Sequence, residues 1–298
     1  MDADQLARRT RRLAAAIEPF AGQVYFSPEC HAEYEALGFA PSPATNGQGM
    51  ALPDGPAYFT SRGSILGQVP GTVVAAAFAV FNPDVVTAGV TAGWTRTDAP
   101  TIAAARDRGA IAQLTRILGA EPDGIGRAVE LLTRATADLR PEGRPLYAGL
   151  SAMDLPGSAL GEAWRRADML REFRGDSHTA SWISAGLDAV EIGLLSELYW
   201  GLPMGTYIRT RAWPAEGLEA GKQRLRDRGL LDHDGFSSAG GEMRESVEHS
   251  TDLQCLPVVR ALGDDVDELV DLLGGFSRAV RDAGGYPPQG PHDLAGQD

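Results

Sequence analysis

The fold of the C-terminal part of this chain is decided by one stretch, Arg224-Leu-Arg-Asp-Arg-Gly-Leu-Leu-Asp-His-Asp-Gly-Phe-Ser-Ser-Ala-Gly240. Gly229 stands where a helix commonly ends in a left-handed glycine. Residues 230–236 predict a strand, an Asp-Gly turn and a second strand. Ser237 or Ser238 can then cap the next helix. The stretch therefore predicts the end of one helix, a small β-wing and the start of another helix.

The residues before this stretch predict the helices that precede a wing. Residues 177–198 predict one helix that is apolar on two opposite faces, and such a helix is buried between layers. Residues 204–211 predict a short helix or turn, and Pro214 begins a helix that ends near Arg228. The inward face of the first helix is expected to hold Ile183, Leu187, Val190, Leu194 and Leu198. Helix, turn, helix and wing in this order predict a winged helix-turn-helix unit over residues 176–254.

Residues 1–173 predict further helices, and the fold class is mainly α: a helical N-terminal half followed by the winged unit with its small β-wing. Helices are expected over 4–17, where Glu18-Pro19 stops or kinks the first, and over 126–139 and 158–173. Asn82 with Pro83, and Thr97 or Asp98 with Pro100, are typical helix starts. Residues 39–56 predict a loop, and residues 72–81 fit a strand or a buried helix. A boundary between residues 140 and 157 predicts two domains, a helical domain over 1–150 and a winged-helix-like domain over 151–298.

The charge of the chain argues against a protein dedicated to DNA binding. The formal net charge is −13, whereas such proteins usually carry a basic footprint. The charge is uneven, because residues 232–298 hold 14 acidic and 4 basic side chains. Residues 206–231 hold 6 basic and 3 acidic side chains, so the predicted recognition helix is locally basic. DNA is therefore a disfavoured partner that the local charge still allows.

Several function classes lack their motifs. The longest apolar run, residues 72–81, is too short to span a bilayer, and residues 1–18 do not resemble a signal peptide, so a cytoplasmic protein without a membrane partner is expected. Cys30 and Cys255 are the two cysteines, and they predict neither a disulfide framework nor a metal motif. The sequence contains no phosphate-binding loop, dinucleotide fingerprint or serine-hydrolase elbow. No metal and no cofactor are expected.

Residues 224–240 resemble the recognition-helix end and wing of MarR-type regulators. Nearly the whole chain resembles an actinobacterial helix-turn-helix family of largely uncharacterised proteins. The resemblance rests on Glu18-Pro19, Tyr25-Phe-Ser-Pro-Glu29, Phe81-Asn-Pro83, Leu170-Arg-Glu-Phe-Arg-Gly-Asp-Ser-His178, Gly186-Leu-Asp-Ala-Val-Glu191 and Val247-Glu-His-Ser-Thr-Asp252. It implies the fold and no particular activity. Relatives usually carry histidine where this chain has Ala21 and Phe173, so any site that those histidines form is altered here.

Three residues are candidates for catalysis. His178 can act as a general acid or base beside Asp176 or Glu191, because imidazole titrates near neutrality; alternatively it is a helix-start histidine bonded to the backbone. Glu29 and Glu191 are flanked by apolar residues, and a half-buried carboxylate needs a partner. A structural ion pair, for example with Arg174, competes with the catalytic interpretation of both.

Aromatic side chains concentrate in the N-terminal half, where they can line a small-molecule pocket or form an ordinary core. The candidate substrate-binding residues are Tyr25, Phe26, Phe81, Asn82, Arg174, Asp176 and Trp182.

Two functions fit these observations. The first is a small-molecule-binding protein or a cofactor-independent enzyme of secondary (natural-product) metabolism, with acid–base chemistry if it is catalytic. The alternative is a ligand-responsive winged-helix transcriptional regulator. A homodimer would place two recognition helices about one DNA turn apart. Its DNA-binding residues would be Arg211, Lys222, Arg224 and Arg226. Gly217 and Gly221 count against a recognition helix, because each weakens a helix by about 1 kcal/mol relative to alanine. A third hypothesis is a non-catalytic interaction module.

Overall fold

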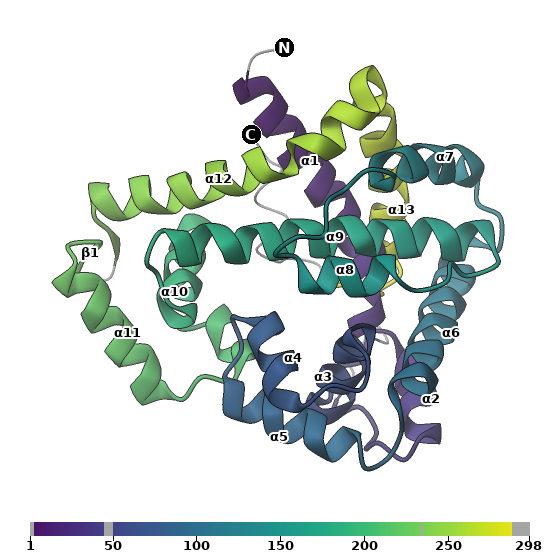
Figure 1. The fold of residues 1–298 in the computed structure, drawn as a ribbon, viewed down its shortest axis with the longest axis horizontal. Coiled ribbons are helices and arrows are strands. Elements are labelled where there is room, and N and C mark those ends of the chain that lie inside the picture. Colours follow the sequence, from purple (N-terminus) through teal and green to yellow (C-terminus); the bar gives the residue numbers. More distant parts are fainter. Residues whose placement is uncertain (1–2, 45–49, 234, 288–298) are drawn as a thin grey trace.

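The computed structural model describes residues 3–44, 50–233 and 235–287, which form a mainly helical protein with a two-stranded sheet (Figure 1). The predicted fold class is confirmed. Three parts of the predictions lie outside the described residues: positions 45–49 of the predicted loop, Asp234 of the predicted Asp-Gly turn, and residues 288–298. No helix in the described ranges is long and apolar enough to cross a membrane.

The N-terminal half is built from short helices whose starts follow local capping rules. Ser27, Asp54, Asn82 and Asp98 each accept a hydrogen bond from a backbone N–H of the helix that follows, so the predicted starts at Asn82 and Asp98 are confirmed. The helices are α1 (Ala3–Gly22), α2 (Pro28–Ala36), α3 (Gly55–Gly63), α4 (Gly71–Phe78), α5 (Pro83–Gly93), α6 (Ala99–Leu118), α7 (Ile125–Thr136) and α8 (Pro145–Ser151), with 3-10 turns η1 (Gln23–Tyr25) and η2 (Ser64–Leu66).

Two local expectations in this half are settled by packing. The sequence of residues 72–81 fitted either a strand or a buried helix. In the structure most of these residues belong to α4, whose Val74, Ala75 and Phe78 are buried. Of the two alternatives predicted for Glu18-Pro19, a stop or a kink, the stop does not occur, because α1 continues to Gly22 with Pro19 inside it. The Glu18 side chain is bound by Arg171 and Tyr286 from distant segments, and these contacts hold the last turn in place.

The C-terminal half has the predicted order of helix, turn, helix and wing. Its helices are α9 (Ala159–Ser184), α10 (Ala189–Tyr199), α11 (Ala215–Asp227), α12 (Ser238–Leu262) and α13 (Val266–Asp282), with 3-10 turns η3 (Tyr207–Arg211) and η4 (Gly263–Asp265). The strands β1 (Leu231–Asp232) and β2 (Gly235–Phe236) pair antiparallel, with Leu231 opposite Phe236. Ser237 caps α12 by accepting from the Gly240 N–H.

The single helix predicted over residues 177–198 is wrong. Residues 159–184 form one long helix, α9. It combines the helix predicted over 158–173 with the first part of the helix predicted over 177–198. The chain turns at Gly186, whose φ of +70° is a conformation that glycine adopts without steric cost. Asp188 then begins α10 in a capping box with Glu191. Because the apolar residues lie on two helices, Ile183 is 57% exposed instead of facing inward.

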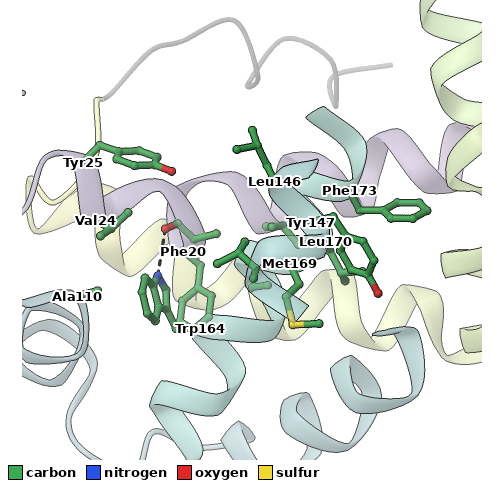
Figure 2. Close-up of a cluster of buried hydrophobic side chains, with 14 of the residues drawn as sticks. Phe20, Val24, Tyr25, Ala110, Leu146, Tyr147, Trp164, Met169, Leu170 and Phe173 are labelled. Carbon is green, nitrogen blue, oxygen red and sulfur yellow. Dashed lines mark hydrogen bonds between the residues drawn. The ribbon is translucent and has the colours of Figure 1, made fainter. Parts of the chain in front are cut away.

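The buried residues form two clusters. The larger contains residues from Leu13 to Phe173 and from Cys255 to Tyr286, and the smaller runs from Trp182 to Val247. The buried core therefore divides within α9 and α12, and the division into domains over residues 1–150 and 151–298 stays a prediction. Figure 2 shows the larger cluster at the crossing of α1 and α9, where Trp164 Nε1 donates to the Ala21 carbonyl at 3.1 Å.

Candidate functional site

A cavity of about 580 Å³ lies where the two halves meet. One side is formed by α9, through residues between Glu172 and Thr179. The N-terminal half contributes side chains of α3, of the last two residues of α4, and of Val80 and Phe81 after it. The winged unit contributes side chains of α10 and η3. The cavity is thus enclosed by elements that are far apart in the sequence.

Aromatic rings form a continuous wall of this cavity. The Tyr58 ring lies 5.1 Å from that of Tyr25 and 5.8 Å from that of Phe81, and Phe59 packs edge-on against Phe81 at 5.5 Å. Such edge-to-face pairs are favourable beyond the area that they bury. The wall offers an apolar surface suited to the faces of a flat ligand.

Glu172 on α9 is the centre of a buried network of charges. Arg62 binds it with two bonds, from Nε to Oε1 at 3.1 Å and from Nη2 to Oε2 at 2.9 Å. Arg171 Nη1 also donates to Oε1 at 2.9 Å. Burial by itself would raise the pKa of Glu172, but the two guanidinium groups hold that pKa at about 2. Glu172 is therefore a carboxylate whose position and charge are fixed before any ligand arrives.

The network continues to the first helix and to the end of the described chain. Arg171 Nε donates to Glu18 Oε2 at 2.9 Å, and the Tyr286 hydroxyl donates to Glu18 Oε1 at 3.0 Å. Arg171 thus joins both carboxylates. The network is rigid and balanced in charge, because it contains two arginines and two glutamates.

Asp176 also lines the cavity, one turn along α9 from Glu172. Its Oδ2 accepts from the Tyr147 N–H at 3.0 Å at the start of α8. Among the described residues no basic side chain forms an ion pair with it. Burial raises the pKa of Asp176 to about 7, against the hydrogen bond from Tyr147, which favours the charged form. Asp176 can therefore gain or lose a proton near neutral pH.

His178 lies at the same cavity, with Nδ1 3.3 Å from the Thr251 hydroxyl of α12. Arg211 lies on the opposite element, η3, where its guanidinium stacks on the rings of Phe81 at 4.7 Å and Tyr207 at 4.6 Å. The cavity consequently presents three arginines, but Arg211 does not belong to the Glu172 network.

The outer helix α11 carries its basic side chains away from the cavity. It packs on α10 and β1 and lies at the outer edge of the molecule (Figure 1). Its bases contact local acceptors: Arg224 binds Asp188 at 2.6 Å, and Lys222 binds Glu219 at 2.7 Å. Arg226 donates to the His233 carbonyl at 3.3 Å. The basic patch is exposed, but acidic neighbours offset part of its charge.

The order of elements in this outer part agrees with a comparison of the whole sequence. The model of a helix-turn-helix family matches residues 10–287. The chain belongs to this helix-turn-helix family. Searches of curated proteins and of solved structures gave no match. The family's description states a fold, so the activity of this helix-turn-helix protein has to be argued from its site.

Five of the residues predicted as catalytic or substrate-binding lie at the cavity of this helix-turn-helix protein. They are Tyr25, Phe26, Phe81, Asp176 and His178. Arg211, predicted as a DNA-binding residue, is a cavity residue too. Asn82 lies beside the cavity and positions one wall, since its N–H donates to the Arg211 carbonyl at 2.9 Å.

The three predicted catalytic residues do not share one cavity, because only His178 lines it. Glu29 lies at the surface and pairs with Arg116 Nε at 2.5 Å. Glu191 completes the capping box of α10 and pairs with Arg228 at 3.0 Å. Both carboxylates are thus held in structural ion pairs, the interpretation that competed with catalysis.

Two predicted binding residues are also engaged elsewhere. Arg174 binds Glu248 and Asp252 of α12. Trp182 is buried in the smaller core cluster. Ala21 and Phe173, the two positions where the resemblance led us to expect histidine, are core positions. Ala21 is fully buried, and Phe173 packs edge-on against Tyr147 at 5.1 Å (Figure 2).

Sequence reasoning missed the charged network of this helix-turn-helix protein. Glu18, Arg171 and Glu172 all lie in stretches that carry the family resemblance, and that was the available signal. Arg62 lies in no such stretch. Its partner Glu172 is 110 residues away in the chain, so no local pattern indicates the pair.

Proposed function

We propose that this helix-turn-helix protein binds a small molecule in the cavity between its two halves. The observation that carries the proposal is a cavity of about 580 Å³ that combines an aromatic wall with charged groups held by other side chains. Ligand sites are typically concave, mainly apolar, and supplied with a few fixed polar groups. The fixed network at Glu172 supports binding, because its side chains are already ordered and the entropy cost of ordering them when a ligand enters is small.

Two titratable groups support acid–base chemistry if the bound molecule is also converted. The Asp176 carboxyl has a pKa of about 7, and His178 lies three residues on in the same helix. A group that titrates near the working pH is an effective proton donor or acceptor. Asp176 is therefore a better candidate for that role than Glu29 or Glu191, which are held by arginines outside the cavity.

The test is to fill the cavity. Gly175 lines it, and a side chain at that position meets only the Glu172 carboxylate, at 3.6 Å from the added Cβ. The variant Gly175→Leu should therefore fold and occupy cavity volume. N-phenylnaphthylamine, a neutral aromatic probe that fluoresces in apolar sites, should bind the wild-type protein at one molecule per chain and bind this variant much more weakly.

Gly126→Leu is the matched control, because Gly126 lies in α7 with open space around it and away from the cavity. This control should bind the probe as the wild type does. Equal binding by Gly175→Leu and wild-type protein would show that the probe does not use the cavity, and would count against the proposal.

A ligand-responsive DNA-binding regulator is the second candidate, and the exposed position of α11 favours it. The helix packs on α10 and β1 and is not covered by the N-terminal half (Figure 1). Gly221, which counted against a recognition helix, is required by packing instead, because a Cβ there would lie 2.5 Å from Val190 Cγ1 of α10. Other residues of α10, among them Ile192, line the cavity, so a ligand would touch the helix that supports α11.

Fluorescence anisotropy with a labelled DNA duplex tests this second candidate. A regulator should bind more weakly as salt rises, because phosphate contacts release counterions. Arg226→Ala should weaken that binding, whereas Arg140→Ala, in the loop before α8, should leave it unchanged. Failure to bind any duplex at low salt would exclude the candidate and leave the cavity proposal untouched.

A further inference from the structure

Arg211 differs from the other two cavity arginines, because neither Glu18 nor Glu172 forms an ion pair with it. Arg62 and Arg171 share Glu18 and Glu172, so their charges are offset inside the protein. Among the described residues, no carboxylate forms an ion pair with Arg211, which donates instead to the neutral Tyr207 hydroxyl. Arg211 is therefore the cavity arginine that no cavity carboxylate contacts, and the remaining cavity acid, Asp176, is only partly ionised at neutral pH because burial raises its pKa to about 7.

The Arg211 side chain is held in a built position. Its guanidinium stacks on the rings of Phe81 and Tyr207. Its carbonyl accepts from the Asn82 N–H at 2.9 Å, which ties η3 to the start of α5. Stacking occupies the faces of a guanidinium and leaves N–H edges for a ligand. The planar group can then bind a carboxylate or sulfonate with two hydrogen bonds.

We propose that the cavity binds an aromatic monoanion, with the anionic group on Arg211 and the rings against Tyr58, Phe59 and Phe81. This assignment rests on the proposed function of the cavity as a small-molecule site. The Glu172 network is balanced in charge, so an anion that bound Arg62 or Arg171 would have to displace a buried carboxylate. An anion that binds Arg211 does not have to displace one. The aromatic wall continues from Phe81 directly to Arg211, so one flat molecule can contact both.

Two matched probes test the proposal. Anilinonaphthalenesulfonate is an aromatic monoanion, and N-phenylnaphthylamine has the same rings without the sulfonate. Arg211→Gln should weaken binding of the sulfonate by about tenfold or more, as expected for loss of a charge-assisted hydrogen bond, and leave the neutral probe within about twofold. Arg209→Gln, at an exposed arginine of η3 outside the cavity, should change neither affinity.

The outcomes separate this proposal from the proposed function. If Gly175→Leu blocks both probes while Arg211→Gln affects them equally, the cavity is a binding site and the anion assignment is overturned. If Gly175→Leu blocks neither probe, the cavity function itself fails. Arg211→Lys keeps the charge without the planar fork, and it should bind the sulfonate with an affinity between those of wild type and Arg211→Gln. Far-ultraviolet circular dichroism checks that each variant is folded.

A second inference rests on a different observation, the order of elements in the two halves. Each half begins with a long helix, α1 or α9, and then has two short segments, α3 and α4 or α10 and η3. A further helix follows, α5 or α11, and then a long helix and a closing helix, α6 and α7 or α12 and α13. Residues 3–136 and 159–282 therefore run through a similar order of main helices, to which the first half adds α2, η1 and η2 and the second half adds the wing strands and η4.

The packing between the halves is reciprocal. The first helix of each half lies on the last helix of the other, since α1 packs on α13 and α9 packs on α7. In the same way α1 contacts α12, and α9 contacts α6. Within the halves, α3 packs on α5 and α6 as α10 packs on α11 and α12. These paired contacts resemble those of two subunits related by a two-fold axis, in which each contact occurs twice, whereas the extensive packing of α12 on α9 and of α2 on α6 belongs to one half only.

The two halves also bond to each other at the junction beside the cavity, where each has an alanine with positive φ, although the ψ angles of the two alanines differ, at −56° for Ala79 and +25° for Ala212. Ala79 ends α4 with a φ of +53°, and Ala212 ends η3 with a φ of +61°, a conformation uncommon for residues other than glycine. Each lies just before the start of the next helix. Asn82 Nδ2 donates to the Ala212 carbonyl at 3.2 Å, and Trp213 Nε1 donates to the Val80 carbonyl at 2.9 Å. A side chain from each half thus donates a hydrogen bond to a backbone carbonyl in the junction of the other half.

We infer that residues 3–136 and 159–282 are two copies of one helix-turn-helix unit packed about a pseudo-two-fold axis, so that the chain forms its own dimer. The copies differ at the position of the recognition helix. α5 contains no basic residue, and the described residues 94–98 that follow it form a turn without a strand. The first copy therefore covers the dimer surface of the second and offers neither a wing nor a basic helix. The protein presents one α11 and acts as a monomer.

Light scattering of the full-length chain after size-exclusion chromatography tests this inference. The expected mass is that of one chain, 31.6 kDa, at every concentration that can be measured. A stable species of twice that mass would overturn the inference, because the dimer surface would then still be available. Trp213→Phe removes the bond to Val80, and Asn82→Ala removes the bond to Ala212 together with the cap of α5. Both variants should destabilise the protein, Asn82→Ala by more, without changing its mass. A mass increase in either variant would also contradict it.

Discussion

The arginines beside the cavity and the arginines of α11 make the same kind of bond in opposite surroundings. Arg62 and Glu172 have 11% and 2% of their side chains exposed, whereas Arg224 and Asp188 have 45% and 48% exposed. A buried pair is strongly destabilising to break, because the remaining charge is left without water or partner. An exposed pair contributes little and is screened by salt.

This contrast between buried and exposed ion pairs indicates which region of the molecule suits ligand binding and which suits contact with DNA. The buried network fixes the shape and charge of the cavity, so it can position a ligand. The pairs on α11 cost little to open, so Arg224 can exchange Asp188, and Lys222 can exchange Glu219, for another anion such as a phosphate. The same residue types thus mark a rigid site in one place and an adaptable surface in the other.

The strongest test of this comparison removes the centre of the buried network. Glu172→Ala should lower the free energy of unfolding by about 3–5 kcal/mol, because Arg62 and Arg171 lose their shared partner inside the protein. Denaturant unfolding measures the loss. The exposed Glu142→Ala should change the same quantity by less than about 0.5 kcal/mol. A loss of that small size for Glu172→Ala would mean that the network does not hold the cavity.

The next test uses the pH dependence of Asp176, the cavity carboxyl without a basic partner. Its pKa is about 7 in the folded protein and near 4 when unfolded, so the folded state binds the extra proton between these values. Stability from this group is therefore full below pH 4 and is lost as pH rises through 7. Relative to Asp176→Asn, the wild type should lose about 2–4 kcal/mol between pH 5 and pH 8.

Asp176→Asn is informative because asparagine can still accept the hydrogen bond from the Tyr147 N–H. Urea unfolding of both proteins across this pH range gives the difference directly. A difference that does not change with pH would show that the carboxyl keeps an ordinary pKa and cannot act as a proton donor near neutrality.

A smaller effect is expected at Glu191, the buried end of the outer network. Glu191→Ala removes half of the α10 capping box and the pair with Arg228, which together should cost about 1–2 kcal/mol. Thermal unfolding measures this loss, and probe binding in the cavity should be retained. A selective loss of probe binding with normal stability would instead place Glu191 in the ligand site.

The smallest effect is expected at the exposed end of the same network. Arg224→Ala should lower stability by less than about 1 kcal/mol, and the difference should shrink as salt is added. Unfolding at low and high salt measures it. A salt-independent loss as large as that of Glu172→Ala would erase the distinction between the two networks.

The sequence by itself determined the elements that depend on near neighbours. Asn82 and Asp98 were recognisable as helix caps because a cap bonds to backbone groups two or three residues away. The helix-turn-helix order and the wing followed from Gly229, the apolar run that follows it and the Ser237 cap. Those signals are local, since they depend on backbone conformation and on hydrogen bonds within one turn.

The tertiary structure alone decided how α9 runs and what surrounds the cavity. The continuation of α9 through Gly175 to Ser184 depends on packing against α12 and α8, which outweighs the weak local preference for a break. The pairing of Arg62 with Glu172 joins residues 110 positions apart, and Arg211 faces the cavity because Asn82, from the other half, holds its backbone. Such contacts depend on which helix faces pack together, and this cannot be predicted from a pattern of residues that are neighbours in the sequence.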